Sequence, residues 1–401
     1  MTENSKNTFL NLVCAKIRQN RQLVPTDFNI STRVEHVDGV PFMNLWFRTG
    51  GCSYDRRGAC TFCNYGISSP VCGKDAISYV KKGLRSLDIN ENTILLLTPS
   101  GSLFDDIEVP DDAFKEILKL VRNTKCRAFL CETRVEYITE EKIKFYASIL
   151  DNKAASLEIG LESANPWILK YCVNKNLSLG DYRRAIQLIQ KYSLGSSTTI
   201  LHGGAFLSPS EAVEDTVNTV KWAFEQGVER ACVFPAHVKK WTLLEWLWKR
   251  NLYSPPSLWS LVDVLEKLGP DFSPRVYIAW HKVFENQESD GKRLDPLDDL
   301  GFVHAATTCG ECRTKVIELL DLYRDYHSFA TIEKLSQVQC ECKDLWRASL
   351  NQPDDLSLQD RVVTQYSIIG NELLGHHWWA RNGNKVIDEV RSSKVESSWR
   401  E

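Results

Sequence analysis

The feature that most constrains this chain is a loop with three cysteines, Cys52, Cys60 and Cys63, in C-x7-C-x2-C spacing. An apolar run over residues 40–47 precedes the loop and predicts a β-strand. The loop is rich in Gly, Asp, Ser and Arg, and its glycines let the backbone turn tightly around an inorganic centre. A loop of this kind can direct three thiolates at one metal cluster.

Three thiolates are one fewer than a 4Fe–4S cluster usually takes from a protein. The missing ligand would leave one iron open to a substrate or a cofactor. A closed zinc site has four ligands at short spacings, and the seven residues between Cys52 and Cys60 exceed the usual gap. The alternative interpretation is that these are ordinary buried or zinc-binding cysteines.

The composition predicts a cytoplasmic chain that does not enter the membrane. No apolar run approaches the roughly twenty residues that cross a membrane, and the first residues do not resemble a secretion signal. The 13 cysteines are therefore expected to be reduced thiols or metal ligands. A net charge of −3 argues mildly against a large polyanionic partner, although a local patch can still bind phosphates.

Beyond the loop, short apolar strands alternate with helical segments, which predicts βαβ units and an α/β fold with a parallel sheet. Further strands are predicted at residues 93–98, 127–132, 155–161, 197–201, 230–235 and 275–280. Helices are predicted at residues 9–21, 74–87, 111–122, 139–150, 179–191, 208–225, 242–249 and 258–268. About six βα units favour a partial (β/α)6 barrel over a full eight-unit barrel.

The regular alternation of strands and helices ends after Pro270, and we predict three regions in the chain. Residues 1–39 form an N-terminal extension, residues 40–285 form the barrel core, and residues 286–401 form a small Cys-rich C-terminal subdomain with a helical tail. Within the last region we expect a polar linker over residues 290–300, a helix over 314–326, and a helical region over 360–374 that leads to a polar tail.

A second group of cysteines lies in the C-terminal region, as CxxC followed later by CxC: Cys309, Cys312, Cys340 and Cys342. Two tight pairs make a good closed metal site. Zinc would act as a structural staple, whereas an auxiliary 4Fe–4S cluster could bind substrate or pass electrons. The sequence leaves both metals open.

Polar residues follow the predicted strands where, in a barrel of parallel strands, the chemistry gathers. They are Ser100, Gly101 and Ser102 after the second strand, Glu132 and Arg134 at the third, and Gly160, Glu162 and Ser163 at the fourth. Ser, Gly and Asp are also ordinary loop residues, so each alone is a weak signal. Together, behind a three-cysteine loop, they predict a binding site.

The cysteine loop resembles that of the radical S-adenosylmethionine (SAM) superfamily, in which an aromatic residue precedes the third cysteine, as Phe62 does here. The resemblance implies a 4Fe–4S cluster on Cys52, Cys60 and Cys63, SAM on the open iron, and a 5′-deoxyadenosyl radical as the reactive product. It also implies an external electron donor.

The same resemblance implies which side chains bind SAM. Phe62 would pack on adenine, the backbone at Gly101 would hydrogen-bond the SAM amino group, and Arg134 would pair with a carboxylate. Glu162 and Ser163 would hold the ribose hydroxyls, or Glu162 would lie beside the sulfonium. The predicted cofactor-binding set is Phe62, Tyr65, Ser100, Gly101, Ser102, Glu132, Arg134, Gly160, Glu162 and Ser163.

Several segments are similar to the branch of the superfamily that holds the elongator catalytic subunit, and most similar to the archaeosine-synthase radical SAM subunit family. They include Gly50–Cys63, Ser100–Ser102, Glu132–Arg134, Ile159–Glu162, Asn174–Asn176 and Leu258–Leu261. The chain departs from that family at Gly203–Ala205 and at His237 and Lys239, in loops that would face the substrate.

The resemblance implies a modified 7-deazaguanine nucleoside of tRNA as substrate, with cleavage of a carbon–nitrogen bond of an attached amino acid. A small metabolite of a specialised pathway is the second hypothesis, favoured by the acidic balance and by the altered loops. A non-catalytic iron–sulfur module is the third.

Overall fold

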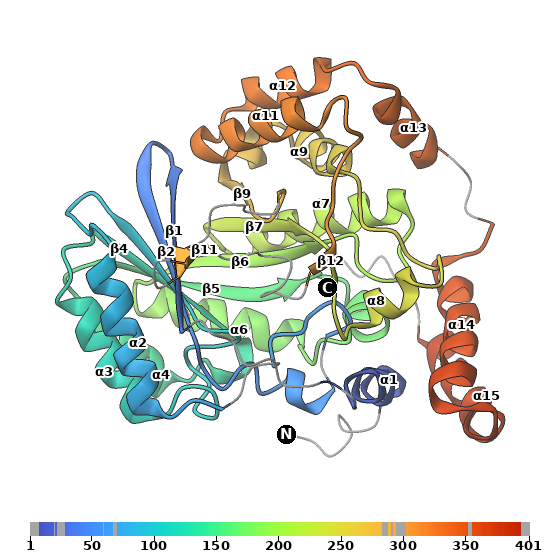
Figure 1. The fold of residues 1–401 in the computed structure, drawn as a ribbon, viewed down its shortest axis with the longest axis horizontal. Coiled ribbons are helices and arrows are strands. Elements are labelled where there is room, and N and C mark those ends of the chain that lie inside the picture. The colour runs from blue at the N-terminus through green and yellow to red at the C-terminus, as the bar shows by residue number, and fades with distance from the viewer. Residues whose placement is uncertain are drawn as a thin grey trace.

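The centre of the fold is one curled sheet of ten strands, seen in the computed structural model of Figure 1. The structure describes residues 8–19, 21, 29–58, 60–66, 70–282, 288–289, 292–293, 302–351 and 355–393. The strand order is β11-β10-β1-β2-β3-β4-β5-β6-β7-β9. The strands from β2 to β9 pair in parallel, which confirms the predicted α/β fold and partial barrel.

The parallel strands lie close to where the apolar runs predict them. They are β2 (Val40–Phe47), β3 (Ile94–Thr98), β4 (Ala128–Thr133), β5 (Ala154–Glu162), β6 (Gly195–His202), β7 (Arg230–Pro235) and β9 (Val276–Ile278). Along each strand, alternate side chains face the helices outside and the barrel interior. The interior-facing set therefore lines whatever space the barrel encloses.

The first strand belongs to the sheet although it precedes the predicted barrel core. Strand β1 (Ile30–Val37) pairs antiparallel with β2 along its whole length. The turn between them is Asp38-Gly39, with φ of 53° and 73°, the conformation of a two-residue hairpin turn that follows the twist of its strands. Two short strands, β10 (Glu288–Ser289) and β11 (Lys292–Arg293), extend this edge.

The helices of the barrel cover the outer face of the sheet (Figure 1). They are α2 (Gly73–Ser86), α3 (Asp111–Arg122), α4 (Glu140–Ile149), α6 (Leu179–Lys191), α7 (Pro209–Glu225) and α9 (Leu258–Phe272). Helix α8 (Leu243–Trp248) instead packs in one apolar cluster with residues of α1 (Phe9–Arg18) and of the cysteine loop. Thr139 caps α4 through a hydrogen bond from the Lys142 amide, as its position predicts. Short apolar helices α5 (Pro166–Ile168) and η4 (Leu169–Val173) follow β5.

The cysteine-rich C-terminal region packs directly on the barrel. It contains α11 (Arg313–Tyr326), α12 (Phe329–Gln337) and α13 (Glu341–Leu350), of which the sequence predicts only the first. Leu320, Tyr323 and Ile332 share one apolar core with Val262 and Leu265 of α9. Strand β12 (Phe302–His304) pairs with β8 (Val238–Lys239), and most of the predicted linker over 290–300 lies outside the described residues.

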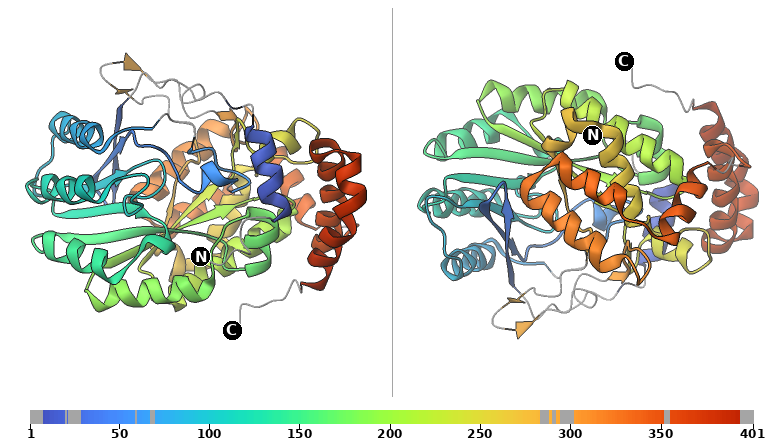
Figure 2. Two further views of the ribbon diagram at one scale, coloured as in Figure 1. Left: turned by 90° about the horizontal axis from the view of Figure 1, so that it is seen from below. Right: turned by 90° about the horizontal axis from the view of Figure 1, so that it is seen from above.

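Residues 376–392 of the predicted polar tail form a long helix. Helix α15 (His376–Ser392) follows α14 (Leu358–Ile369) and the π-helical turn η6 (Gly370–Leu374). Its Trp379, Val386 and Val390 recur at helical spacing and pack against α1 (Phe9–Arg18), which lies between this hairpin and the barrel (Figure 2). Among the described helices, none combines the length and the hydrophobicity that spanning a membrane requires.

Candidate active site

The three cysteines of the first motif lie together at one end of a cavity inside the barrel. Cys52, Cys60 and Cys63 all line this cavity, whose volume is about 380 Å³. That volume lies in the range of small-molecule sites. Burial raises the pKa of all three thiols, that of Cys63 to about 12. The ionised form that binds metal therefore needs positive charge nearby.

Each of the three thiols has a cation nearby. Burial raises the pKa of each thiol, and the cation lowers it by a smaller amount. The pairs are Arg134 with Cys52, Lys175 with Cys60, and Lys239 with Cys63. Nη1 of Arg134 lies 3.6 Å from the sulfur of Cys52. The three cations thus oppose the effect of burial without reversing it.

Glycine and backbone hydrogen bonds fix the shape of the loop. Gly51 has φ of +77°, and a Cβ there would lie 2.6 Å from the Tyr65 carbonyl oxygen, so the position requires glycine. Thr61 donates from its amide to the Val173 oxygen at 3.0 Å and from its hydroxyl to the Cys172 oxygen at 2.8 Å. The loop is thereby fastened to the π-helical turn η4.

Eight of the ten predicted cofactor-binding residues line the cavity: Phe62, Tyr65, Ser100, Gly101, Glu132, Arg134, Gly160 and Glu162. Ser102 and Ser163 do not. The Ser102 hydroxyl is 2.9 Å from that of Thr133, and the Ser163 hydroxyl donates to Asp215 at 2.7 Å. Both serines hold neighbouring backbone in place and face away from the cavity.

Gly101 brings the loop after β3 against the cysteine loop. A Cβ at Gly101 would lie 2.8 Å from Cα of Cys52 and 2.5 Å from Oε2 of Glu108. Glu108, which the sequence analysis missed, accepts hydrogen bonds from the Thr49 hydroxyl at 2.6 Å and the Ser102 amide at 2.7 Å. Its burial raises the pKa of Glu108 to about 7. This carboxyl group joins the two loops.

Aromatic side chains form the wall of the cavity beside the third cysteine. Phe62 is 9% exposed, and its ring centre lies 6.1 Å from that of Phe234. The ammonium of Lys239 lies 4.5 Å from the ring centre of Tyr65. These rings offer flat apolar surfaces next to the loop.

Two carboxyl groups face the cavity side by side on neighbouring strands. Glu132 and Glu158 are register partners of β4 and β5, and Ser197 donates to Glu158 at 3.1 Å. Within the described residues neither makes an ion pair. Burial and the mutual repulsion of the carboxylates raise the pKa of Glu132, and burial raises that of Glu158 to about 7. The pair therefore holds a proton at neutral pH.

A third carboxylate at the end of β5 is paired with a lysine. Oε1 of Glu162 lies 2.7 Å from Nζ of Lys175, while its buried Oε2 has no hydrogen-bond partner in the described structure. Glu162 has φ of 68°, which is unusual for a residue with a side chain and is typical of functional positions. The period-two series Glu158, Gly160, Glu162 in an apolar strand is the sequence signal that Glu158 shares this face.

Other side chains with metal-ligating atoms also line the cavity. They are Cys232, His237 and the carboxyl groups of Glu132, Glu158 and Glu162. His237 is held on both sides, with Nδ1 3.0 Å from the Ala306 amide and Nε2 2.9 Å from the Trp280 oxygen. Cys232 lies beside the carboxyl groups of Glu158 and Glu132, which raise its pKa together with burial.

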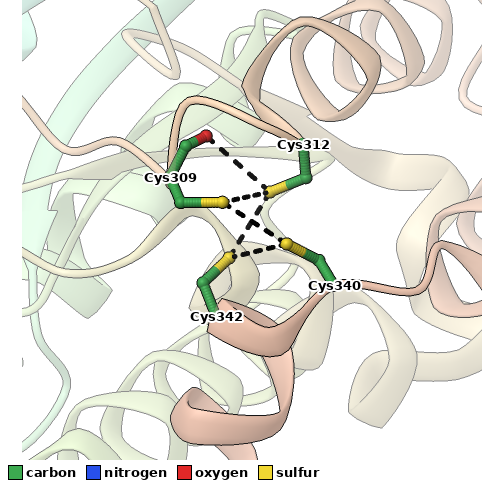
Figure 3. Close-up of side chains that lie close together, drawn as sticks. All are labelled: Cys309, Cys312, Cys340 and Cys342. Carbon is green, nitrogen blue, oxygen red and sulfur yellow. Dashed lines mark hydrogen bonds between the residues drawn. The ribbon is translucent and has the colours of Figure 1, made fainter.

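The second cysteine group forms a compact cluster between the start of α11 and the start of α13 (Figure 3). Neighbouring sulfurs of Cys309, Cys312, Cys340 and Cys342 are 3.3 to 3.6 Å apart. A single tetrahedral ion with metal–sulfur bonds of about 2.3 Å spaces its thiolates by about 3.8 Å. The arrangement therefore fits one ion that all four thiolates share. Nε1 of Trp259 lies 3.1 Å from the sulfur of Cys342.

The two cysteine groups differ in the spacing of their sulfurs. Among the described residues, only the C-terminal group brings three or more metal-ligating atoms within 4.8 Å of one another. The sulfurs of Cys52, Cys60 and Cys63 do not form such a compact group. In a 4Fe–4S cluster each thiolate binds a different iron, so the three sulfurs of the loop need not converge on one point.

Comparisons with known proteins agree with this geometry. No protein-family model matches the chain. Archaeosine synthase subunit beta of Methanosarcina acetivorans is 28% identical over 355 residues, which cover 86% of this chain and 97% of that protein. Archaeosine synthase subunit beta of Thermococcus kodakarensis is 29% identical over 242 residues, which cover 58% of this chain and 74% of that protein.

A solved structure of the archaeal Elp3 of Methanocaldococcus infernus, with an N-terminal deletion, is 18% identical with a TM-score of 0.44. The alignment covers 67% of this chain and 60% of that one. The chain is thus similar to archaeosine synthase beta subunits along most of its length. The predicted resemblance is confirmed.

Proposed function

We propose that this chain is a radical SAM enzyme in which Cys52, Cys60 and Cys63 hold a 4Fe–4S cluster. The observation that carries the proposal is a loop whose three buried thiols, each near a cation, line one cavity of about 380 Å³. When bound, the cluster would supply an electron that cleaves SAM into methionine and a 5′-deoxyadenosyl radical. An external donor would reduce the cluster.

The residues around the loop would bind and orient SAM. Phe62 and Tyr65 offer the apolar surfaces for adenine, and the close approach of Gly101 to Cys52 exposes backbone beside the open iron. Glu162 carries a free buried oxygen suited to a ribose hydroxyl. The surrounding wall would keep water away from a reactive intermediate.

We expect Cys60→Ala to abolish both cluster absorbance of the loop and formation of 5′-deoxyadenosine, because two thiolates cannot hold the cluster. The measurement is 5′-deoxyadenosine release by anaerobically reconstituted protein with dithionite and SAM. The matched control is Cys126→Ala, at a buried cysteine outside the cavity. Unchanged SAM cleavage in Cys60→Ala, or none in the wild-type protein, would contradict the proposal, and the latter outcome would favour a non-catalytic iron–sulfur module.

For the substrate we propose a modified 7-deazaguanine nucleoside of tRNA. The support is the similarity to archaeosine synthase subunit beta, which spans 97% of that relative. A small metabolite is the second candidate, because the net charge is −3 and carboxyl groups line the cavity.

A deletion strain of the source organism separates the two substrates. We expect its tRNA hydrolysate to accumulate a precursor nucleoside, which the wild-type gene removes and the Cys60→Ala gene does not. The measurement is mass spectrometry of tRNA nucleosides and of small-molecule extracts from the same cultures. Unchanged tRNA together with an accumulated metabolite would establish the second candidate instead.

We propose further that the substrate group inside the barrel carries a positive charge. Glu132 and Glu158 lie in register, and neither makes an ion pair with a described residue, although the charge of Arg33 acts on Glu132. Buried carboxylates are costly unless they are paired. An amine of an attached amino acid would supply the missing charge.

We expect Glu158→Gln to lower substrate turnover at least tenfold while SAM cleavage in the absence of substrate is retained, since losing one partner of a buried charge pair typically costs about 2–5 kcal/mol. Because folding raises the pKa of Glu158 to about 7, its protonated form stabilises the fold, and this contribution is lost as the pH rises through 7. The variant should therefore have the higher Tm at pH 8, with a smaller difference at pH 6. Equal turnover in the two proteins would refute the assignment.

We propose zinc for the C-terminal cysteine group. The sulfur spacing of 3.3 to 3.6 Å fits one shared ion, and four thiolates are a typical structural zinc set. The ion would join α11 and α13 to the barrel, where Trp259 of α9 donates to the sulfur of Cys342.

Metal analysis of purified protein should find one zinc per chain, and Cys312→Ser should lose it. We expect this loss to lower the Tm while the cluster spectrum of the loop remains, because the two cysteine groups are separate. Iron in place of zinc in a Cys60→Ala background would show that the C-terminal group holds a cluster.

A further inference from the structure

Two arginines of the N-terminal segment lie directly behind the cysteine loop. Nη2 of Arg18, at the end of α1, donates to the backbone oxygens of Cys60 at 3.1 Å and Cys63 at 2.6 Å. Nη2 of Arg21 donates to the Gly66 oxygen at 2.7 Å. The sequence gives no sign of these contacts, which join residues more than forty positions apart.

One aspartate of the loop stands between the two arginines. Asp55 lies 3.1 Å from Arg18 and 2.7 Å from Arg21, and it accepts a hydrogen bond from the Gly66 amide at 2.7 Å. The side chain of Arg18 is 5% exposed, that of Arg21 is 8% exposed and that of Asp55 is 1% exposed. Two cations and one anion leave one net positive charge in a dry environment.

The positive charge is incompletely compensated. Nε and Nη1 of Arg18 are buried and have no hydrogen-bond partner in the described structure. Burial lowers the pKa of Arg18, but Asp55 and the thiols of Cys14, Cys63 and Cys60 raise it overall. The guanidinium is therefore charged, and charges in such surroundings act more strongly than in water.

We infer that the triad of Arg18, Asp55 and Arg21 raises the reduction potential of the cluster held by Cys52, Cys60 and Cys63. The inference rests on the proposed function, because it needs the cluster. Reduction adds one negative charge, and a fixed positive charge behind two of the three ligand residues stabilises the reduced form. Net charge and hydrogen bonding around a cluster are the means by which proteins set its potential. Arg18 is a positioning residue, because it acts on the cluster through the cysteine loop.

A purely structural role makes a different prediction. If the triad only held the loop, replacing any member would loosen it and lower cluster occupancy, with no ordered change of potential. If the charge of the triad acts on the cluster, removing a cation must lower the reduction potential of the cluster, and removing the anion must raise it.

The experiment measures the midpoint potential of the reconstituted full chain by an EPR-monitored dithionite titration. We expect Arg18→Gln to lower the equilibrium constant for cluster reduction at least tenfold, which is about 59 mV for one electron. Asp55→Asn, whose side-chain oxygen can still accept from the Gly66 amide, should shift the potential in the positive direction. Arg18→Lys should stay near the wild type, and Arg122→Gln, at an exposed pair with Asp151, is the control that should not shift.

Shifts of equal sign, or none, in Arg18→Gln and Asp55→Asn would overturn the inference. If Arg18→Gln does not retain a cluster, Arg21→Gln decides, because Arg21 does not contact the carbonyl groups of the ligand cysteines and its loss should also lower the potential. A wild-type protein that assembles no cluster would overturn the proposed function and this inference together. A wild-type protein that cleaves SAM while the variants lack opposite shifts would overturn the inference alone.

Discussion

The structure depends on three buried thiols that lie close to cations. Cysteine binds metal as the thiolate, and burial opposes that form, as the raised pKa values of Cys52, Cys60 and Cys63 show. Cations from four separate places oppose this effect of burial. They are Arg134 after β4, Lys175 after η4, Lys239 on β8, and Arg18 on α1. The chemistry of the loop therefore belongs to the whole fold, because the loop alone carries none of these charges.

The parallel sheet and the cysteine loop can be predicted from the sequence, because apolar runs and cysteine spacing are local features that do not depend on distant partners. The apolar runs predict all seven parallel strands, and α3 and α6 have the predicted bounds. Helices α12, α13 and α15 were not predicted, since their sequences are mostly polar and become helical through contacts with distant elements. The buried partners of the loop, such as Arg18 and Glu108, could not be predicted either. A single charged residue carries no sign of what it will face across the fold.

The two cysteine groups show what sequence spacing can and cannot decide. CxxC and CxC predict a closed site but are compatible with zinc or a cluster, and only the sulfur positions distinguish one shared ion from several irons. Four sulfurs 3.3 to 3.6 Å apart have room for a single ion at their centre. The three sulfurs of the loop do not form such a compact group.

Side chains of opposite charge lie a short distance apart on the cavity wall. Their positions limit how two ligands can share the cavity. Arg134 follows Glu132 by two residues on the same face, a rise of about 7 Å along an extended chain. The positive zone at the cysteine loop favours a carboxylate, as on the methionine part of SAM, and the carboxyl pair beyond it favours a cation. Both zones line the same cavity of about 380 Å³. Under the proposed function, two ligands in these zones would lie close together, and a radical formed on one would meet the other before it meets water.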